Sequence, residues 1–239
     1  MTLRVFRFCL AVILLAPMSG CASYEPQYSA KSIEAWVIDA DTNEPIEGVI
    51  VVANWEILAG EMSARSKIIQ LKILESITDK KGRFYFSTWG PEPNPSMIGY
   101  MGYGPQILLF KSGYKYRGLV NAVTYTSESG PLRSSDWDGK TITMRKQASD
   151  PASLLRDYEQ LNYSVESIVR NAPCDWSKVP RLLLAVRKER LLLQEKGVTG
   201  GIFSLPAVDQ FLVNNAERYS RPGDSGCASP AQFFQSSAP

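Results

Sequence analysis

Short runs of β-branched and aromatic residues, each interrupted by Asp, Asn, Gly or Pro, recur between residues 32 and 146. This texture constrains the fold more than any other feature of the chain, because such runs are typical of strands joined by tight turns. In the first run Ile33, Ala35 and Val37 recur at every second position, the pattern of a strand with one buried face. Seven strands are predicted, at Ile33–Asp39, Gly48–Glu56, Ile68–Ile77, Arg83–Thr88, Gln106–Lys111, Arg117–Tyr125 and Thr141–Lys146. Seven short strands predict an antiparallel β-sandwich over residues 32–146.

Three turn clusters punctuate this region. Residues 39–48 read Asp-Ala-Asp-Thr-Asn-Glu-Pro-Ile-Glu-Gly, residues 78–84 read Thr-Asp-Lys-Lys-Gly-Arg-Phe, and Gly113-Tyr114 follows a predicted strand. Asx side chains cap such turns, proline sets its own φ, and glycine supplies a positive φ. Together the clusters resemble the carboxypeptidase regulatory-like domain, a transthyretin-like β-sandwich, over residues 33–145.

The resemblance implies a transthyretin-like fold and has two departures. Ala35 stands where the family often has glycine, and residues 88–105 form an insertion. In carboxypeptidases the module accompanies a zinc peptidase domain whose ligands include histidine. The chain contains no histidine, so the resemblance does not imply peptidase activity. The same absence excludes His-based catalytic triads and His-ligated zinc.

A small helical region is predicted over residues 147–227. Asp150 has the character of an N-cap followed by Pro151 at the first helical position, and apolar residues then recur at helical spacing. We expect three helices, at about 151–170, 177–196 and 205–219. Mixed charges at residues 187–195 predict a solvated face on the second helix. The Ser/Ala/Pro-rich residues 228–239 predict a flexible tail.

The first twenty residues have the pattern of a signal peptide. Arg4 and Arg7 precede an apolar run at residues 8–16 that is too short to span a bilayer. The segment ends in Met-Ser-Gly-Cys at 18–21, which resembles the bacterial lipoprotein cleavage box. The resemblance implies that residues 1–20 are removed and that Cys21 carries the lipid, a diacylglyceryl group and an acyl chain such as palmitate. An ordinary secretory peptide cut nearby is the alternative.

Residues 21–31 then read as a short tether between the lipid and the fold. Ala22 follows the cysteine at the position where Asp would signal retention in the inner membrane, so we expect anchoring at the periplasmic face of the outer membrane. Loss of Arg4 and Arg7 would leave 24 basic residues against 24 acidic residues. A chain without a basic excess is a poor partner for nucleic acid. The expected partners are therefore the membrane, through the lipid, and another envelope protein.

Export also bears on the four cysteines. Cys9 would leave with the signal peptide and Cys21 would carry lipid, so Cys174 and Cys227 remain for an oxidising compartment. A disulfide bond between these two residues is the favoured interpretation. Free thiols and a two-cysteine metal site are the alternatives.

Three short segments mimic catalytic or metal-binding motifs. Residues 223–226 copy the tetrapeptide around a trypsin-like serine but lack a histidine base. Ser112 and Lys115 have the Ser-x-x-Lys spacing of penicillin-binding enzymes, but on a turn after a strand and not at a helix start. Asp136 and Asp138 offer too few oxygen ligands for calcium. We expect these segments to be turns, and the chain to have no catalytic residue, cofactor or metal site.

The segment from 89 to 105 is rich in Gly, Pro, Tyr and Met, a composition suited to a binding surface or to a loop covering a sheet edge. Its candidate partner-contacting residues are Trp89, Met97, Tyr100, Met101 and Tyr103. The leading functional hypothesis is a non-enzymatic envelope lipoprotein whose sandwich is a binding or scaffolding module facing the periplasm. A lipoprotein subunit of a type VI-like secretion apparatus is the alternative, and an unidentified enzyme is the third.

Overall fold

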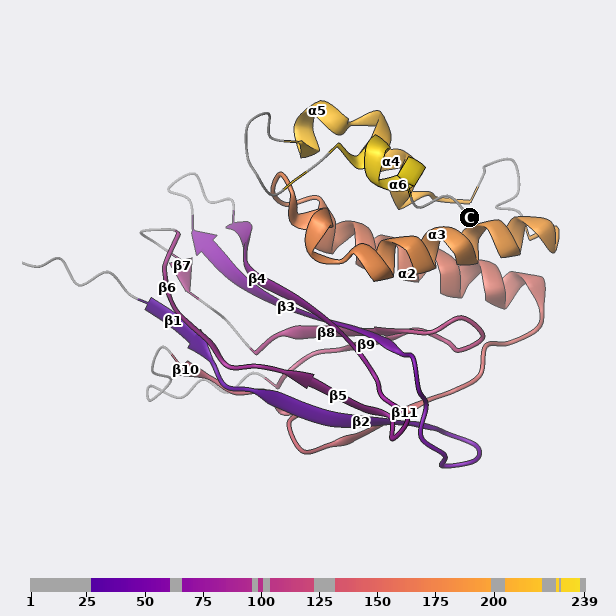
Figure 1. Ribbon diagram of the computed structural model, residues 1–239, viewed down its shortest axis with the longest axis horizontal. Coiled ribbons are helices and arrows are strands. Elements are labelled where there is room, and N and C mark those ends of the chain that lie inside the picture. Colours follow the sequence, from indigo (N-terminus) through magenta and orange to yellow (C-terminus); the bar gives the residue numbers. More distant parts are fainter. Residues whose placement is uncertain are drawn as a thin grey trace, which may run out of the picture.

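The computed structural model describes residues 27–60, 66–95, 99–100, 104–122, 132–198, 205–220, 227 and 229–236. These residues form a small β-sheet, a larger β-sheet in the middle and a layer of helices on the outer face of the larger sheet (Figure 1). The prediction of a β-sandwich followed by helices is confirmed at this level of detail. No helix in this part of the chain is long and apolar enough to cross a membrane.

The small sheet, of order β11-β2-β5, is built around β2 (Ile33–Asp39), whose residues alternate between buried and half-buried. The strand β5 (Arg83–Phe86) pairs with β2 in the antiparallel sense, and β11 (Thr141–Met144) pairs with it in the parallel sense. The parallel pair differs from the all-antiparallel sandwich that we expected. It arises because the chain reaches β11 from a strand in another sheet and not through a hairpin.

The middle sheet has the order β4-β3-β8-β9. Its strands are β3 (Ile50–Gly60), β4 (Ser66–Ile77), β8 (Gln106–Phe110) and β9 (Arg117–Leu119), and β7 (Gly99–Tyr100) pairs with the far end of β3. The long strands β3 and β4 extend beyond the predicted limits, and their register shifts between Trp55 and Glu56. Such a bulge bends a strand and increases its twist.

A third, short sheet of order β10-β1-β6 lies at one end of the sandwich (Figure 1). It contains β1 (Gln27–Ala30), β6 (Trp89–Pro93) and β10 (Leu132–Arg133). The strand β1 corrects the expectation of a tether over 21–31, because Tyr28 and Ala30 are buried in the sandwich core. The described residues thus form eleven strands where seven were expected. The four additional strands have two to five residues each, too short for an alternating pattern to identify them.

The helical layer begins with α2 (Pro151–Val169), where Asp150 Oδ1 accepts a hydrogen bond from the Ser153 amide at 2.9 Å. The other helices are η1 (Asp175–Lys178), α3 (Pro180–Glu195), α4 (Val208–Asn214), α5 (Ala216–Tyr219) and α6 (Pro230–Ser236). The expected second helix is therefore divided just before Pro180, where proline lacks an amide donor and favours a helix start. The expected third helix is divided at Asn215.

The helix α6 corrects the expectation of a flexible tail over residues 228–239. Phe234 is buried, and the neighbouring Phe233 ring lies 5.3 Å from the Trp176 ring. The free energy gained by packing two aromatic side chains against apolar partners offsets the conformational entropy lost when one short helix becomes ordered. Composition alone did not show this, because Trp176 lies 57 positions before Phe233 in the sequence.

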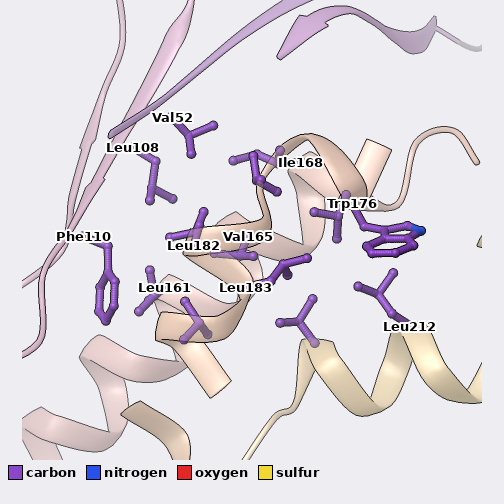
Figure 2. Packing of buried hydrophobic residues seen from close by; sticks show 14 of the residues in the cluster. Val52, Leu108, Phe110, Leu161, Val165, Ile168, Trp176, Leu182, Leu183 and Leu212 are labelled. Atoms are coloured by element: carbon purple, nitrogen blue, oxygen red, sulfur yellow. The ribbon is translucent and has the colours of Figure 1, made fainter. Parts of the chain in front are cut away.

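The helices share one hydrophobic core with the outer face of the middle sheet. Figure 2 shows Val52, Leu108 and Phe110 of the sheet facing side chains of α2 and α3. The start of α3 is also attached to β4, because Glu75 accepts hydrogen bonds from the amides of Arg181 and Leu182 at 3.2 and 2.9 Å. Burial raises the pKa of Glu75, and these two amides oppose the shift in part.

The charged stripe on α3 is only in part the solvated face that we expected, because Lys188 and Glu195 are exposed but the two charged residues between them are not. Glu189 is buried, and Arg190 is only 6% exposed and donates to Asp209 Oδ2 of α4 at 2.7 Å. A charge pattern on one helix cannot show this arrangement, because the partner acid lies on another helix. Buried charges of this kind must be paired.

Candidate functional site: a cleft between the middle sheet and helix α2

The three turn clusters that carry the family resemblance meet in space at one end of the sandwich. Tyr114 Oη donates a hydrogen bond to Asp39 Oδ2 at 2.9 Å. Thr78 Oγ1 accepts from the Val49 amide at 2.8 Å and donates to the Ile46 carbonyl at 2.6 Å. These side chains are occupied with one another and with the backbone. These contacts therefore stabilise the fold.

The Ser-x-x-Lys segment does not bring its two side chains together. Ser112 Oγ donates to Glu189 Oε2 of α3 at 2.6 Å, and Lys115 Nζ pairs with Asp157 of α2 at 2.9 Å. Each residue links the sandwich to a different helix. Ser112 and Lys115 therefore connect the sandwich to the helical layer, and the serine has no adjacent lysine that could act as its base.

The acidic turn also has a structural role. Asp138 Oδ1 accepts from the Glu34 amide at 2.9 Å, and Asp136 Oδ2 accepts from the Ala122 amide at 2.5 Å. Residues 223–226 lie outside the described residues. In the described part of the chain, no three His, Cys, Asp or Glu residues are grouped so that they could hold a metal ion.

Cys174 and Cys227 form a disulfide bond, with a Cα–Cα distance of 5.5 Å and a sequence separation of 53. The bond joins the turn between α2 and η1 to the segment before α6. Cys227 is buried against the helical core. The predicted lipid attachment site Cys21 lies outside the residues that the structure describes.

The predicted partner-contacting segment is divided by the structure. Trp89 is only 7% exposed, and its ring lies 5.4 Å from the ring of Trp55 in an edge-to-face arrangement. This residue therefore belongs to the sandwich core and is not a free contact residue. Tyr100 lies on β7, where its backbone pairs with Leu58. Met97, Met101 and Tyr103 lie outside the described residues.

A cleft of about 400 Å³ opens between the middle sheet and the C-terminal half of α2. Its lining comes from both layers: Glu56, Ile68, Gln106, Tyr163, Ser167, Arg170 and Asn171. The volume lies within the usual range for small-ligand sites. The hydrophobic packing between the layers ends at this margin, and polar side chains replace it.

Glu56 is the most constrained polar group in the cleft. Its Oε1 accepts a hydrogen bond from Asn54 Nδ2 at 2.7 Å, and its Oε2 accepts one from Gln106 Nε2 at 3.2 Å. Burial raises the pKa of the Glu56 carboxyl, and the Asn54 hydrogen bond opposes the shift in part. A carboxylate has about four acceptor positions, so Glu56 keeps capacity for a further donor.

The amide side chains of Asn54 and Gln70 support this wall of the cleft. Asn54 is only 2% exposed, and its Oδ1 has no hydrogen-bond partner. Gln70 donates from Nε2 to the Ile168 carbonyl of α2 at 2.7 Å, while its buried Oε1 has no partner. Gln70 is opposite Glu56 in the β3–β4 register and fixes the helix to the sheet beside the cleft.

Beside Glu56 the cleft also has an apolar and aromatic margin. Tyr163 of α2 is 72% exposed and Ile68 of β4 is 47% exposed. Leu58 is opposite Ile68 in the β3–β4 register and is also exposed. Exposed apolar side chains beside a polar cleft are typical of interaction sites.

Arg170, the cation in the cleft lining, is already engaged. Its Nη1 pairs with Glu166 Oε1 at 3.0 Å, and the guanidinium carbon lies 5.8 Å from the Phe211 ring centre. Ser167 and Asn171 bond locally along the helix: Ser167 Oγ donates to the Ser164 carbonyl and Asn171 Nδ2 to the Ser167 carbonyl. The lining thus combines one oriented acid, amide groups and an apolar margin, an arrangement suited to binding.

The sequence contained a signal for part of this cleft. Asn54 and Glu56 continue the alternation of Ile50 and Val52, so they share the helix-facing side of β3. Polar residues that interrupt a buried face mark the end of its packing or a site. The contributions of α2 had no such signal, because its exposed residues look like an ordinary solvated face.

No protein-family model matches the chain, and no curated protein matches it. The pilus 2b backbone protein of group B streptococcus is similar over 49% of this chain and 41% of that chain, at 16% identity and a TM-score of 0.25. The shaft pilin of Lactobacillus rhamnosus GG is similar over 52% of this chain and 48% of that chain, at 13% identity and a TM-score of 0.24. For chlorocatechol 1,2-dioxygenase of Pseudomonas putida the shares are 50% and 60%, at 11% identity and a TM-score of 0.25. The chain spans less than two thirds of each of these structures, and none of them is specifically a carboxypeptidase regulatory-like domain.

Proposed function

We propose that the chain is a non-enzymatic lipoprotein of the bacterial outer membrane, with a binding module on the periplasmic face. The signal-peptide pattern and Cys21 support the anchor. The disulfide bond between Cys174 and Cys227 supports an oxidising compartment. We further propose that the sandwich is of the transthyretin-like type, which is supported by the contacts that join its three turn clusters.

An anchor at Cys21 would hold the module close to the bilayer. The strand β1 begins at Gln27, and the intervening residues reach at most ~20 Å when fully extended. The start of β1 and the end of β3 lie at the same end of the long axis (Figure 1). The cleft beside Glu56 would then face a partner near the membrane surface.

The observation that carries the binding function is the cleft itself. It joins an oriented acid, amide groups and an exposed apolar margin across two layers of the fold. Its polar groups are attached to strands and to a helix, so the binding geometry is held before a ligand arrives. Among its lining residues, the hydroxyl of Ser167 already donates to the Ser164 carbonyl, which favours binding over nucleophilic chemistry.

Affinity purification of the intact lipoprotein from envelope, with matched cleft variants, tests this proposal. Asn171→Trp would fill the cleft, whereas Asn214→Trp places the same ring at an exposed position at the end of α4. We expect a partner that is retained by the original chain and by Asn214→Trp and lost with Asn171→Trp. Equal recovery with both variants would contradict binding at the cleft. Recovery of inner-membrane secretion proteins would assign the chain to a type VI-like apparatus.

A further inference from the structure

We infer that the cleft between the middle sheet and α2 binds a primary ammonium group on an aliphatic stem, as in a lysine side chain of a partner protein. This inference rests on the proposed binding function and names its ligand chemistry. The cleft has an acid on β3, Glu56, and an apolar margin formed by β4 and α2. Its cation, Arg170, is already paired.

The charge of Glu56 is the first argument. Two amide groups, from Asn54 and Gln106, fix the orientation of the carboxylate within the cleft. Among the described residues Glu56 forms no ion pair. Glu56 is half-buried, so its carboxylate has lost part of its hydration, and a cationic donor would compensate for that loss. A cationic hydrogen-bond donor that enters from the open side of the cleft would complete the coordination of Glu56.

The margin of the cleft is the second argument. Ile68 and Tyr163 are exposed beside the acid and together present an aliphatic chain and an aromatic ring. A lysine side chain has a four-carbon apolar stem and a compact ammonium group. The stem would pack on Ile68, and a tyrosine face attracts an ammonium group. A small inorganic cation has no apolar stem to pack on Ile68.

The engagement of Arg170 is the third argument, because this residue could otherwise neutralise the acid. Its ion pair with Glu166 of α2 and its position over the Phe211 ring of α4 already engage the guanidinium. The same pairing lowers its capacity to attract an anionic ligand. The group in the cleft that lacks a counter-ion is therefore the acid, and the complementary ligand is a cation.

The full chain in detergent micelles, labelled with nitrogen-15, is titrated with three probes. The first is Nα-acetyl-lysine N-methylamide, and the second is the norleucine analogue, which keeps the apolar stem and lacks the amine. We expect saturable amide shifts near Gln106 and Arg170 with the lysine probe and none with the norleucine probe. The third probe, pentane-1,5-diamine, distinguishes the sources: equal binding indicates free amines, and weaker binding indicates a lysine within a protein.

Two matched variants complete the test. Glu56→Gln keeps the shape of the side chain and removes its charge, and it should weaken the lysine probe at least about tenfold. Glu217→Gln removes an exposed acid on α5, outside the cleft lining, and should leave binding unchanged. Unchanged amide shifts far from the cleft would show that the Glu56→Gln chain remains folded.

Equal binding of the lysine and norleucine probes would overturn the inference, as would full binding by folded Glu56→Gln. Failure of the lysine probe would also overturn it. If the envelope partner is nevertheless lost with Asn171→Trp, the proposed binding function stands and only the ligand chemistry is wrong. If probe binding is seen but partner recovery ignores the cleft, the ligand chemistry stands and the proposed protein partner does not use it.

Discussion

The hydroxyl of Tyr114 donates a hydrogen bond to Asp39 Oδ2 at 2.9 Å across 75 positions of sequence. The other oxygen of the same carboxylate accepts from the amides of Asp41 and Thr42 at 2.8 and 3.1 Å. The Asp41 amide and then the Tyr114 hydroxyl lower the pKa of Asp39. One side chain thus closes the turn after β2 and ties the turn after β8 to it.

Tyr114→Phe removes only the hydroxyl of this contact. We expect the melting temperature to fall by about 2–4 °C at neutral pH, because one hydrogen bond to a carboxylate is lost. The lowered pKa of Asp39 means that its contribution is present above the ordinary Asp pKa and is lost as the pH falls. The difference from the original chain should therefore shrink in acid. Thermal unfolding followed by circular dichroism measures this, with exposed Tyr163→Phe as the control.

Glu56→Gln should raise the melting temperature at neutral pH. Burial raises the pKa of Glu56 above its value in the unfolded chain, so the charged form costs folding stability. That cost is complete above the folded pKa and disappears as the pH falls below the ordinary Glu pKa of about 4.3. The gain should therefore vanish in acid. A variant that is less stable than the original chain at neutral pH would show that the hydrogen bonds from Asn54 and Gln106 outweigh the cost of burying the charge.

Removal of the disulfide bond should destabilise the helical layer. The bond closes a loop over a sequence separation of 53, worth about 4 kcal/mol on the chain-entropy model. Cys174→Ala and Cys227→Ala should each lower the melting temperature, and the double variant should cost no more than either single variant. Clearly additive losses, or two thiols that react with an alkylating agent in the native protein, would contradict the bond.

Trp89 and the residues that follow it should behave differently. Trp89→Ala should cost about 3–5 kcal/mol of unfolding free energy, because the ring is buried against Trp55.

Replacing residues 100–103 by Gly and Ser should change the melting temperature by only a few degrees and abolish recovery of the envelope partner. Chemical denaturation and affinity purification provide the two measurements. Partner recovery with a stable fold after the replacement would restrict binding to the cleft.

Cys21→Ser should prevent lipid attachment. We expect the chain to appear in the soluble periplasm or to remain as an unprocessed precursor, because two or more acyl chains are needed for stable anchoring. Metabolic labelling with a tagged palmitate, followed by membrane fractionation, measures both effects. Label retained by the Cys21→Ser chain would exclude Cys21 as the lipid site.

Local sequence patterns were sufficient for the elements whose residues carry their own signal. The alternation from Ile33 predicted β2 with both of its ends, and Asp150-Pro151 predicted the start of α2. These signals depend on strand and helix periods and on backbone capping, which neighbouring residues determine. The pairing of Cys174 with Cys227 was also accessible, because few cysteines remained to choose from.

Tertiary structure alone decided which elements pack together. The sequence by itself did not place β1 in a sheet, bury Trp89, or pair Arg190 with Asp209, because each depends on residues far away in the chain. The cleft has the same origin. Glu56 interrupts the buried face of its strand, whereas Arg170 follows a helical segment that looks ordinary in isolation, and only the packing of α2 on the middle sheet brings them to one site. Periodicity assigns a residue to one face of a helix or strand, whereas contacts between residues distant in the sequence determine which element packs against that face.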